Sequence, residues 1–252
     1  MEFRDPFATA AQPYGQTRSA VGFDAGLRAY MLRIYNYMAS ALALTGIVAL
    51  VAANSPAFLQ AIYTVNPNGH MGMTGLGWLI TIAPLGLVLW LSMGIQRMSI
   101  TTAQAVYWGF ATLIGLSMTS IFIVYTGESI ARTFFVTAGT FGAMSIWGYT
   151  TKKDLTGMGH FLIMGLIGII IASIVNMFMH SSGMAWAISV LGVAIFVGLT
   201  AYDTQKLKNM YYQIGGGADM LAKVSIMGAL TLYLDFINMF MYLLRFMGDR
   251  RN

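Results

Sequence analysis

Seven long apolar stretches dominate this sequence, and they constrain its fold more than any other feature. A helix needs about 20 apolar residues to cross about 30 Å of hydrocarbon, and each stretch has nearly that length. A spanning sheet would instead show short segments of alternating polarity. We therefore expect an all-α integral membrane protein, a bundle of seven helices at 34–53, 76–95, 105–125, 130–148, 160–179, 185–203 and 224–247. The fourth is the least secure, because Arg132 lies near its start.

The composition agrees with this class and excludes others. Of the 252 residues, 57% are apolar and 9% charged, which is too little charge to cover a water-facing surface. The net charge of +5 is spread over connections and tails, whereas nucleic-acid binding needs clustered Lys and Arg. The absence of cysteine excludes disulfides and thiolate chemistry. Residues 1–33 are polar and lack a signal-peptide core, so we expect a cytoplasmic tail before one transmembrane domain at 34–248.

Basic residues predict the orientation of the bundle. The connections after the first, third and fifth stretches hold no Lys or Arg. The N-terminal tail and the other connections hold Arg4, Arg18, Arg28, Arg33, Arg97, Lys152, Lys153, Lys206, Lys208 and Lys223. The positive-inside rule therefore predicts a cytoplasmic N-terminus. Seven spans would then place Arg245, Arg250 and Arg251 at the outer face, against the rule. Either the C-terminus is an exception, which we favour, or the last stretch does not fully cross.

Two aspartates in the last two stretches are the strongest functional signal. Asp235 lies about 15 Å from either end of its stretch, at 1.5 Å per residue. A carboxyl group at that depth must be protonated, paired with a cation or exposed to water. Asp203 ends the preceding stretch one turn before Lys206, so it could instead pair with that lysine at the membrane surface. If the two carboxyl groups meet, they titrate in two separated steps and form a weak, transient site for calcium, a hard cation.

Polar side chains also recur at helical spacing. Thr231, Asp235, Asn238 and Tyr242 share one face of the seventh stretch, and Thr137 lies within a threonine stripe of the fourth. Such residues commonly hydrogen-bond between packed helices, and that interpretation stays open. The alternative is that Thr231, Asn238, Tyr242 and Thr137 line a pore.

Several motifs resemble one known family. They are Tyr-Asp-Thr-Gln-Lys at 202–206, Leu-Tyr-Leu-Asp-Phe-Ile-Asn at 232–238, Leu-Leu-Arg-Phe at 243–246 and Trp-Gly-Tyr-Thr-Thr-Lys-Lys-Asp-Leu at 147–155. With Ser-Ile-Phe-Ile-Val-Tyr-Thr at 120–126, they are similar to the Bax inhibitor family in its bacterial, YccA-like branch. The resemblance covers about residues 25–248.

The resemblance implies six helices around a central C-terminal helix, in a bacterial inner membrane. It also implies a pH-sensitive calcium leak, governed by an aspartate pair that corresponds to Asp203 and Asp235. In the family's closed form an arginine at the cytoplasmic end of the second span takes part, and Arg97 is the nearest match here. Calcium would be the permeant ion, and no cofactor is implied.

Three functions compete at this point. The first is the proton-controlled cation leak. The second is a non-transporting regulator of a membrane-bound ATP-dependent protease or stress-response complex, because some bacterial relatives are associated with such a protease. The third, an intramembrane aspartyl protease, would need Gly-x-Gly-Asp where this chain has Leu-Tyr-Leu-Asp, and those glycines open the backbone beside the second carboxyl group. We therefore do not expect an enzyme.

Overall fold

The computed structural model describes residues 14–65, 71–214 and 217–251. Its helices are α1 (Tyr14–Ala53), α2 (Pro56–Ile62), α3 (Gly75–Gly94), α4 (Ile100–Ser117), α5 (Thr119–Val124), α6 (Gly127–Thr150), α7 (Thr156–Met179), α8 (Ser182–Ile214) and α9 (Ala218–Met247). A short antiparallel hairpin of β1 (Tyr63–Val65) and β2 (Met71–Met73) pairs Tyr63 with Met73. The prediction of an all-α membrane protein is confirmed.

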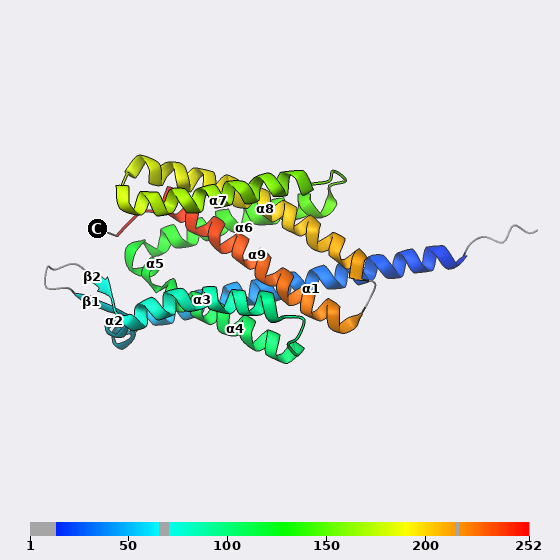
Figure 1. The fold of residues 1–252 in the computed structure, drawn as a ribbon, viewed down its shortest axis with the longest axis horizontal. Coiled ribbons are helices and arrows are strands. Elements are labelled where there is room, and N and C mark those ends of the chain that lie inside the picture. The colour runs from blue at the N-terminus through cyan, green and yellow to red at the C-terminus, as the bar shows by residue number, and fades with distance from the viewer. Residues whose placement is uncertain (1–13, 66–70, 215–216, 252) are drawn as a thin grey trace, which may run out of the picture.

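The helices form two lobes joined by the C-terminal helix (Figure 1). One lobe contains α1, α3 and α4, and the other contains α6, α7 and α8. Helix α9 runs obliquely between the lobes and packs against α8, α1, α6 and α4. Its core residues include Ile226, Leu232, Tyr233 and Met239, none of which is exposed. The C-terminal helix is therefore the central element of the bundle.

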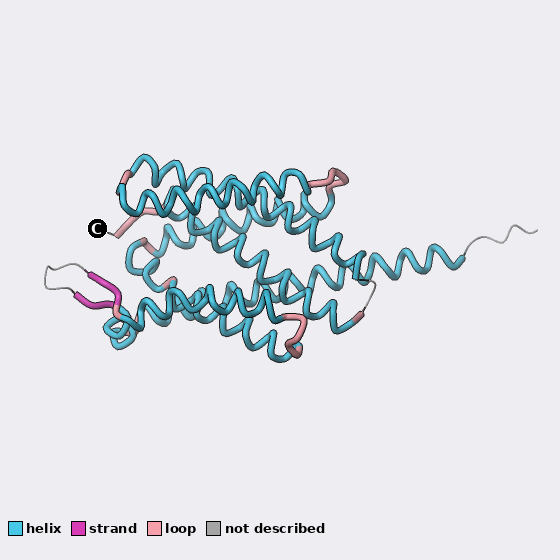
Figure 2. Tube along the Cα trace, in the orientation of Figure 1, coloured by secondary structure: helices cyan, strands magenta, loops and turns pink. Residues whose placement is uncertain are grey.

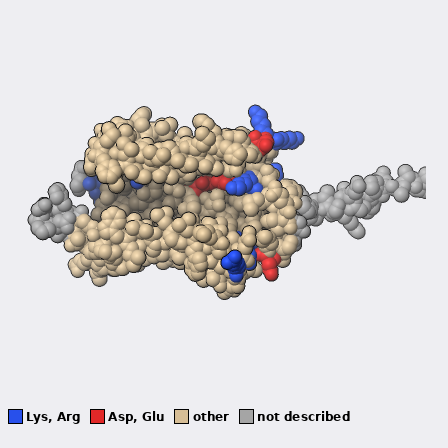
Figure 3. Space-filling model, in the orientation of Figure 1, with Lys and Arg blue, Asp and Glu red and all other residues tan. Residues whose placement is uncertain are grey.

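Six helices or helix pairs in the described part of the chain are long and apolar enough to span a membrane: Ala25–Ala53, Gly75–Gly94, Ile100–Val124, Thr156–Met179, Ser182–Ile214 and Ala218–Met247. Helix α6, the fourth predicted span, has 24 residues and is as long as α7 but more polar. On the face shown in Figure 3, charged side chains gather at the two ends of the bundle and in a furrow between the lobes. The apolar flanks between those ends suit a hydrocarbon environment.

Hydroxyl side chains fix where several helices begin. Ser55, Thr74, Ser99 and Thr126 precede α2, α3, α4 and α6, and each side chain accepts a hydrogen bond from a backbone N–H in the first turn. This capping satisfies donors that have no partner inside the helix. The tube in Figure 2 shows short loops between α3 and α4, between α6 and α7 and between α7 and α8, whereas α2 and the β1–β2 hairpin separate α1 from α3.

Three predicted boundaries differ from the structure. Helix α1 begins at Tyr14 and already buries Leu27 and Tyr30, so the expected boundary between tail and bundle at 33/34 lies inside a helix. The third predicted span is divided at Met118 into α4 and α5. Helix α8 continues past its predicted end at Asp203 to Ile214.

The last described residues fasten α9 to the corner between α5 and α6. The backbone N–H of Thr126 donates to Asp249 O at 3.1 Å, and that of Arg251 donates to Val124 O at 2.8 Å. The Asp249 carboxylate accepts from Arg132 at 2.9 Å and from the Ser129 hydroxyl at 3.1 Å. We call residues 249–251 with these partners the C-terminal clasp.

Candidate functional site: a buried pair of carboxyl groups

Asp203 and Asp235 lie where α8 and α9 pack closely together. Close packing depends on small residues, because a Cβ atom on Gly228 of α9 would lie 2.7 Å from a methyl carbon of Leu207 on α8. A Cβ on Gly192 of α8 would likewise meet the ring of Tyr242 on α9. Only the lack of a side chain at these positions lets the helices approach this far.

The two carboxyl groups are buried and in contact. The exposed fraction of Asp203 is 8% and that of Asp235 is 4%, and their side chains lie close enough together to interact. An ionised carboxylate can only accept, so a hydrogen bond between two carboxyl groups requires at least one proton on the pair. Within the described chain, Asp235 Oδ2 is buried and has no hydrogen-bonding partner. Neither carboxyl group forms an ion pair with a described residue, so a proton on the pair would be the simplest way to neutralise it.

The sequence alone left open whether Asp203 ends its helix at the membrane surface, and in the structure the helix continues past it. Because α8 continues about three turns beyond Asp203, this residue lies inside the bundle rather than at its edge. The polar residues that follow are held by the α6–α7 connection: Gln205 accepts from Leu155 N at 2.8 Å and donates to Lys153 O at 2.7 Å. Lys208 Nζ donates to Tyr149 O at 2.7 Å. These bonds keep a polar segment helical where the sequence suggested an end.

The basic residues considered for this site do not form ion pairs with it. Lys206 is exposed, its ammonium group lies 5.8 Å from the ring centroid of Tyr202, and its charge acts on Asp203 only at longer range. Arg97 is exposed in the turn after α3. Among the described residues the single ion pair within 4.0 Å joins Arg132 and Asp249. In this conformation, therefore, Arg97 is not a partner of the pair.

The residues considered as pore-lining make local contacts. Thr231, Asn238 and Thr137 each donate to a carbonyl four residues earlier in their own helix, at 3.1, 2.8 and 2.8 Å. Tyr242 stacks on Phe196, with ring centroids 5.9 Å apart. Such back-bonding satisfies a hydroxyl or amide without a second helix. Of the site residues predicted from the sequence, the structure therefore brings Asp203 and Asp235 together, whereas the pore-lining candidates do not join them in one site.

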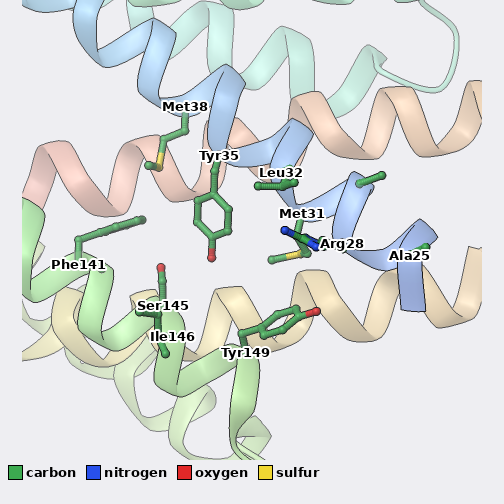
Figure 4. A pocket seen from close by; sticks show the side chains of 12 residues that line it. Ala25, Arg28, Met31, Leu32, Tyr35, Met38, Phe141, Ser145, Ile146 and Tyr149 are labelled. Atoms are coloured by element: carbon green, nitrogen blue, oxygen red, sulfur yellow. The ribbon is translucent and has the colours of Figure 1, made fainter. Parts of the chain in front are cut away.

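Sequence reasoning missed the residues that connect the pair to a cavity. A cavity of about 970 Å³ lies between α1 and α6, with Arg28, Tyr35, Ser145 and Tyr149 among its lining residues. Figure 4 shows the Ser145 hydroxyl pointing into this space opposite Tyr35. Ser145 also hydrogen-bonds to Thr204, the neighbour of Asp203, at 3.3 Å. A sequence signal for this contact is Gly148, one turn after Ser145. A Cβ atom added at Gly148 would collide with the backbone of Ala201 on α8, so this glycine marks a close approach of α6 to α8.

The pair alone offers few ligands for a metal ion. The described residues contain no group of three or more His, Cys, Asp or Glu side chains that could hold one. Two carboxyl groups supply at most four oxygens, whereas calcium takes six to eight. The arrangement suits brief contact with a partly hydrated cation rather than storage.

Comparison with known proteins places the chain in a family. Residues 27–252 match the family model described as "Inhibitor of apoptosis-promoting Bax1". An uncharacterized protein of Rickettsia prowazekii is 52% identical over 91% of this chain and 93% of its own length. The inner membrane protein YbhL of Escherichia coli K12 is 51% identical over 94% of this chain and 99% of its own length. A match over nearly the whole chain shows that this protein belongs to the Bax inhibitor-1 family.

Proposed function

We propose that this protein is a pH-sensitive cation leak channel of a bacterial inner membrane, with calcium as its permeant ion and Asp203–Asp235 as its proton-controlled gate. The observation that carries the proposal is the contact between two buried carboxyl groups on adjacent central helices. The membrane assignment draws on YbhL, whose name places it in the inner membrane.

Loss of the shared proton supplies the force for opening. Two unit charges about 4 Å apart repel by about 4 kcal/mol at an effective dielectric constant of about 20. Two carboxylates held together in this way are relieved when α8 and α9 separate, or when water or a cation enters between them. Protonation removes the repulsion and restores the hydrogen bond, so acid closes the gate and alkali opens it.

The surroundings of the pair favour an ion pathway that approaches the pair from one side. The cavity between α1 and α6 reaches Ser145, and Ser145 contacts Thr204 beside Asp203. Beyond Asp235, the buried residues of α9 are apolar: Phe236, Met239, Phe240, Leu243 and Leu244. We interpret this conformation as closed, because neither aspartate is among the residues that line this cavity and apolar residues follow the pair along α9.

Calcium flux into liposomes tests the gate. Purified protein is reconstituted in vesicles that contain a calcium indicator, and flux is recorded from mildly acidic to mildly alkaline pH. The wild type should leak faster as the pH rises. Asp235→Asn and Asp203→Asn should each flatten this response, because one titrating group is lost. Asp219→Asn is the matched control, since Asp219 lies in the first turn of the same helix α9 and is exposed.

A full pH response in Asp235→Asn would contradict the gate, whereas no flux above that of empty vesicles would contradict transport itself. The second outcome would favour the alternative function, regulation of a membrane-bound protease through helix contacts. That alternative predicts co-purification with such a protease regardless of the protonation of the pair.

A further inference from the structure

Four arginines lie at the end of the bundle that carries the C-terminus. The positive-inside pattern of the other connections does not explain their presence there. They are Arg132, Arg245, Arg250 and Arg251, and the carboxylates nearby in the sequence are Glu128 and Asp249. Two of the arginines have structural roles in the C-terminal clasp. Arg132 pairs with Asp249, and Arg251 Nη1 donates to Phe122 O at 3.2 Å.

The other two arginines line a second cavity. Arg245 and Arg250 form no ion pair in the described chain, and both border a space of about 480 Å³ between α7, α8 and the end of α9. The Arg245 guanidinium lies 5.9 Å from the ring centroid of Tyr242, and the backbone of Arg250 pairs with that of Tyr125. Two arginines thus border one cavity without a carboxylate partner among the described residues.

The remaining lining residues complete an anion site at a membrane surface. Ser173 brings a hydroxyl group and Asn176 an amide group to the cavity, and Arg with such groups suits the oxygens of a phosphate. The hydroxyl of Ser189, which also borders the cavity, already donates to Ala185 O at 2.9 Å. Trp186 and Phe246 border the same space, with ring centroids 6.4 Å apart. Aromatic residues of this kind are typical of the level of lipid headgroups.

The lipid-facing surface beside the cavity is strongly apolar. Met177, Phe178 and Trp186 are 64%, 76% and 61% exposed, at the ends of α7 and α8 that border the cavity. A ligand bound here therefore has a charged part beside the arginines and can extend apolar chains along these helices. This combination distinguishes a phospholipid from a free anion.

We propose that the cavity between α7, α8 and the end of α9 binds the phosphate of an anionic phospholipid from the leaflet at that end of the bundle. Arg245 and Arg250 hold the phosphate oxygens, the Ser173 hydroxyl and the Asn176 amide orient the phosphate, and the acyl chains lie against α7 and α8. The site is separate from the carboxyl pair.

Lipid binding to the detergent-purified full-length chain tests the proposal by native mass spectrometry. Phosphatidylglycerol is compared with phosphatidylcholine of the same acyl chains, so that only the headgroup differs. We expect tighter binding of phosphatidylglycerol, with Kd raised roughly tenfold, or about 1.4 kcal/mol, for each of Arg245→Gln and Arg250→Gln, since each variant loses a charge-assisted hydrogen bond to the phosphate. Arg251→Gln is the matched control, because this neighbouring arginine does not line the cavity.

Two results would overturn the site: unchanged phosphatidylglycerol binding in the double variant, or an equal loss in Arg251→Gln. Adding inorganic phosphate separates the two sources of the anion. Displacement of the lipid by phosphate at equal concentration would contradict a lipid site, and retention of the lipid supports it. If the double Gln variant does not purify as a folded protein, the double Lys variant replaces it. The Lys variant keeps the positive charges but lacks the planar guanidinium groups that bind two phosphate oxygens at once, so we expect a smaller rise in Kd. No rise would overturn the proposal.

Discussion

Substitution of Gly148 by alanine should loosen the contact between α6 and α8 that leads to the carboxyl pair. The new Cβ would overlap the carbonyl oxygen of Ala201 and lie 2.8 Å from its Cα, so backbone rather than a flexible side chain must move. Overpacking of this kind costs about 1–3 kcal/mol. The higher helix propensity of alanine offsets about 0.5–1 kcal/mol. We expect a net loss of about 1–2 kcal/mol.

Thermal unfolding in detergent measures this loss against a matched control. For a chain of this length, 1 kcal/mol corresponds to about 2–4 °C in Tm, so Gly148→Ala should unfold about 2–8 °C below the wild type. Gly142→Ala introduces the same group on the same helix, but its Cβ would have no neighbour within 4 Å. The control should keep or slightly raise the Tm. An equal Tm for the two variants would refute the argument that backbone contact at Gly148 limits the approach of α6 to α8.

Two further predictions concern polar groups away from the pair. Thr45→Val should lower the free energy of unfolding by about 1–3 kcal/mol, because the Thr45 hydroxyl bonds to Tyr233 Oη at 2.7 Å and to Ala111 O at 2.9 Å in a buried site. Thr231→Val, which removes a bond within one helix, should cost less, and equal losses in thermal unfolding would contradict this reasoning. Asp154 accepts from the hydroxyl and backbone N–H of Thr156, and these bonds lower its pKa below 3.8. Since the folded pKa is depressed, these two hydrogen bonds are formed above pH 3.8 and are lost as the pH falls through the lower value. The Thr156 amide should therefore lose protection, measured against the intrinsic exchange rate at each pH, only in strong acid. The same loss should already appear at neutral pH in Asp154→Ala, which removes the accepting oxygen.

Much of the fold could be predicted because the length and apolarity of a membrane helix are properties of the sequence itself. Helices α3, α6 and α7 begin and end within about four residues of the predicted spans, and α9 ends at its predicted residue but begins about six residues earlier. The end of α8 could not be predicted, because Asp203, Gln205 and Lys208 form a polar segment that is typical of a membrane surface. Their partners lie on α9, α6 and the α6–α7 connection, and only tertiary packing brings those partners within reach.

The candidate site was predictable to a similar extent. An aspartate in the middle of an apolar stretch is conspicuous, so Asp235 could be identified alone. Ser145 could not, because a single serine in a helix is ordinary and its contact with Thr204 spans 59 residues. The pore-lining prediction for Thr231 and Asn238 relied on a shared helical face, but short polar side chains can also satisfy themselves on their own backbone, as they do here.

The C-terminal clasp has a practical consequence for handling the protein. The final residues join two helices that are far apart in the sequence, through main-chain bonds to Val124 and Thr126 and side-chain bonds to Ser129 and Arg132. Truncation of the chain after Met247 would remove the residues that form these bonds. A reporter fused directly to the end of α9 would replace the same residues. Tags are better placed at the other terminus, because α1 begins at the opposite end of the bundle from the C-terminus (Figure 1).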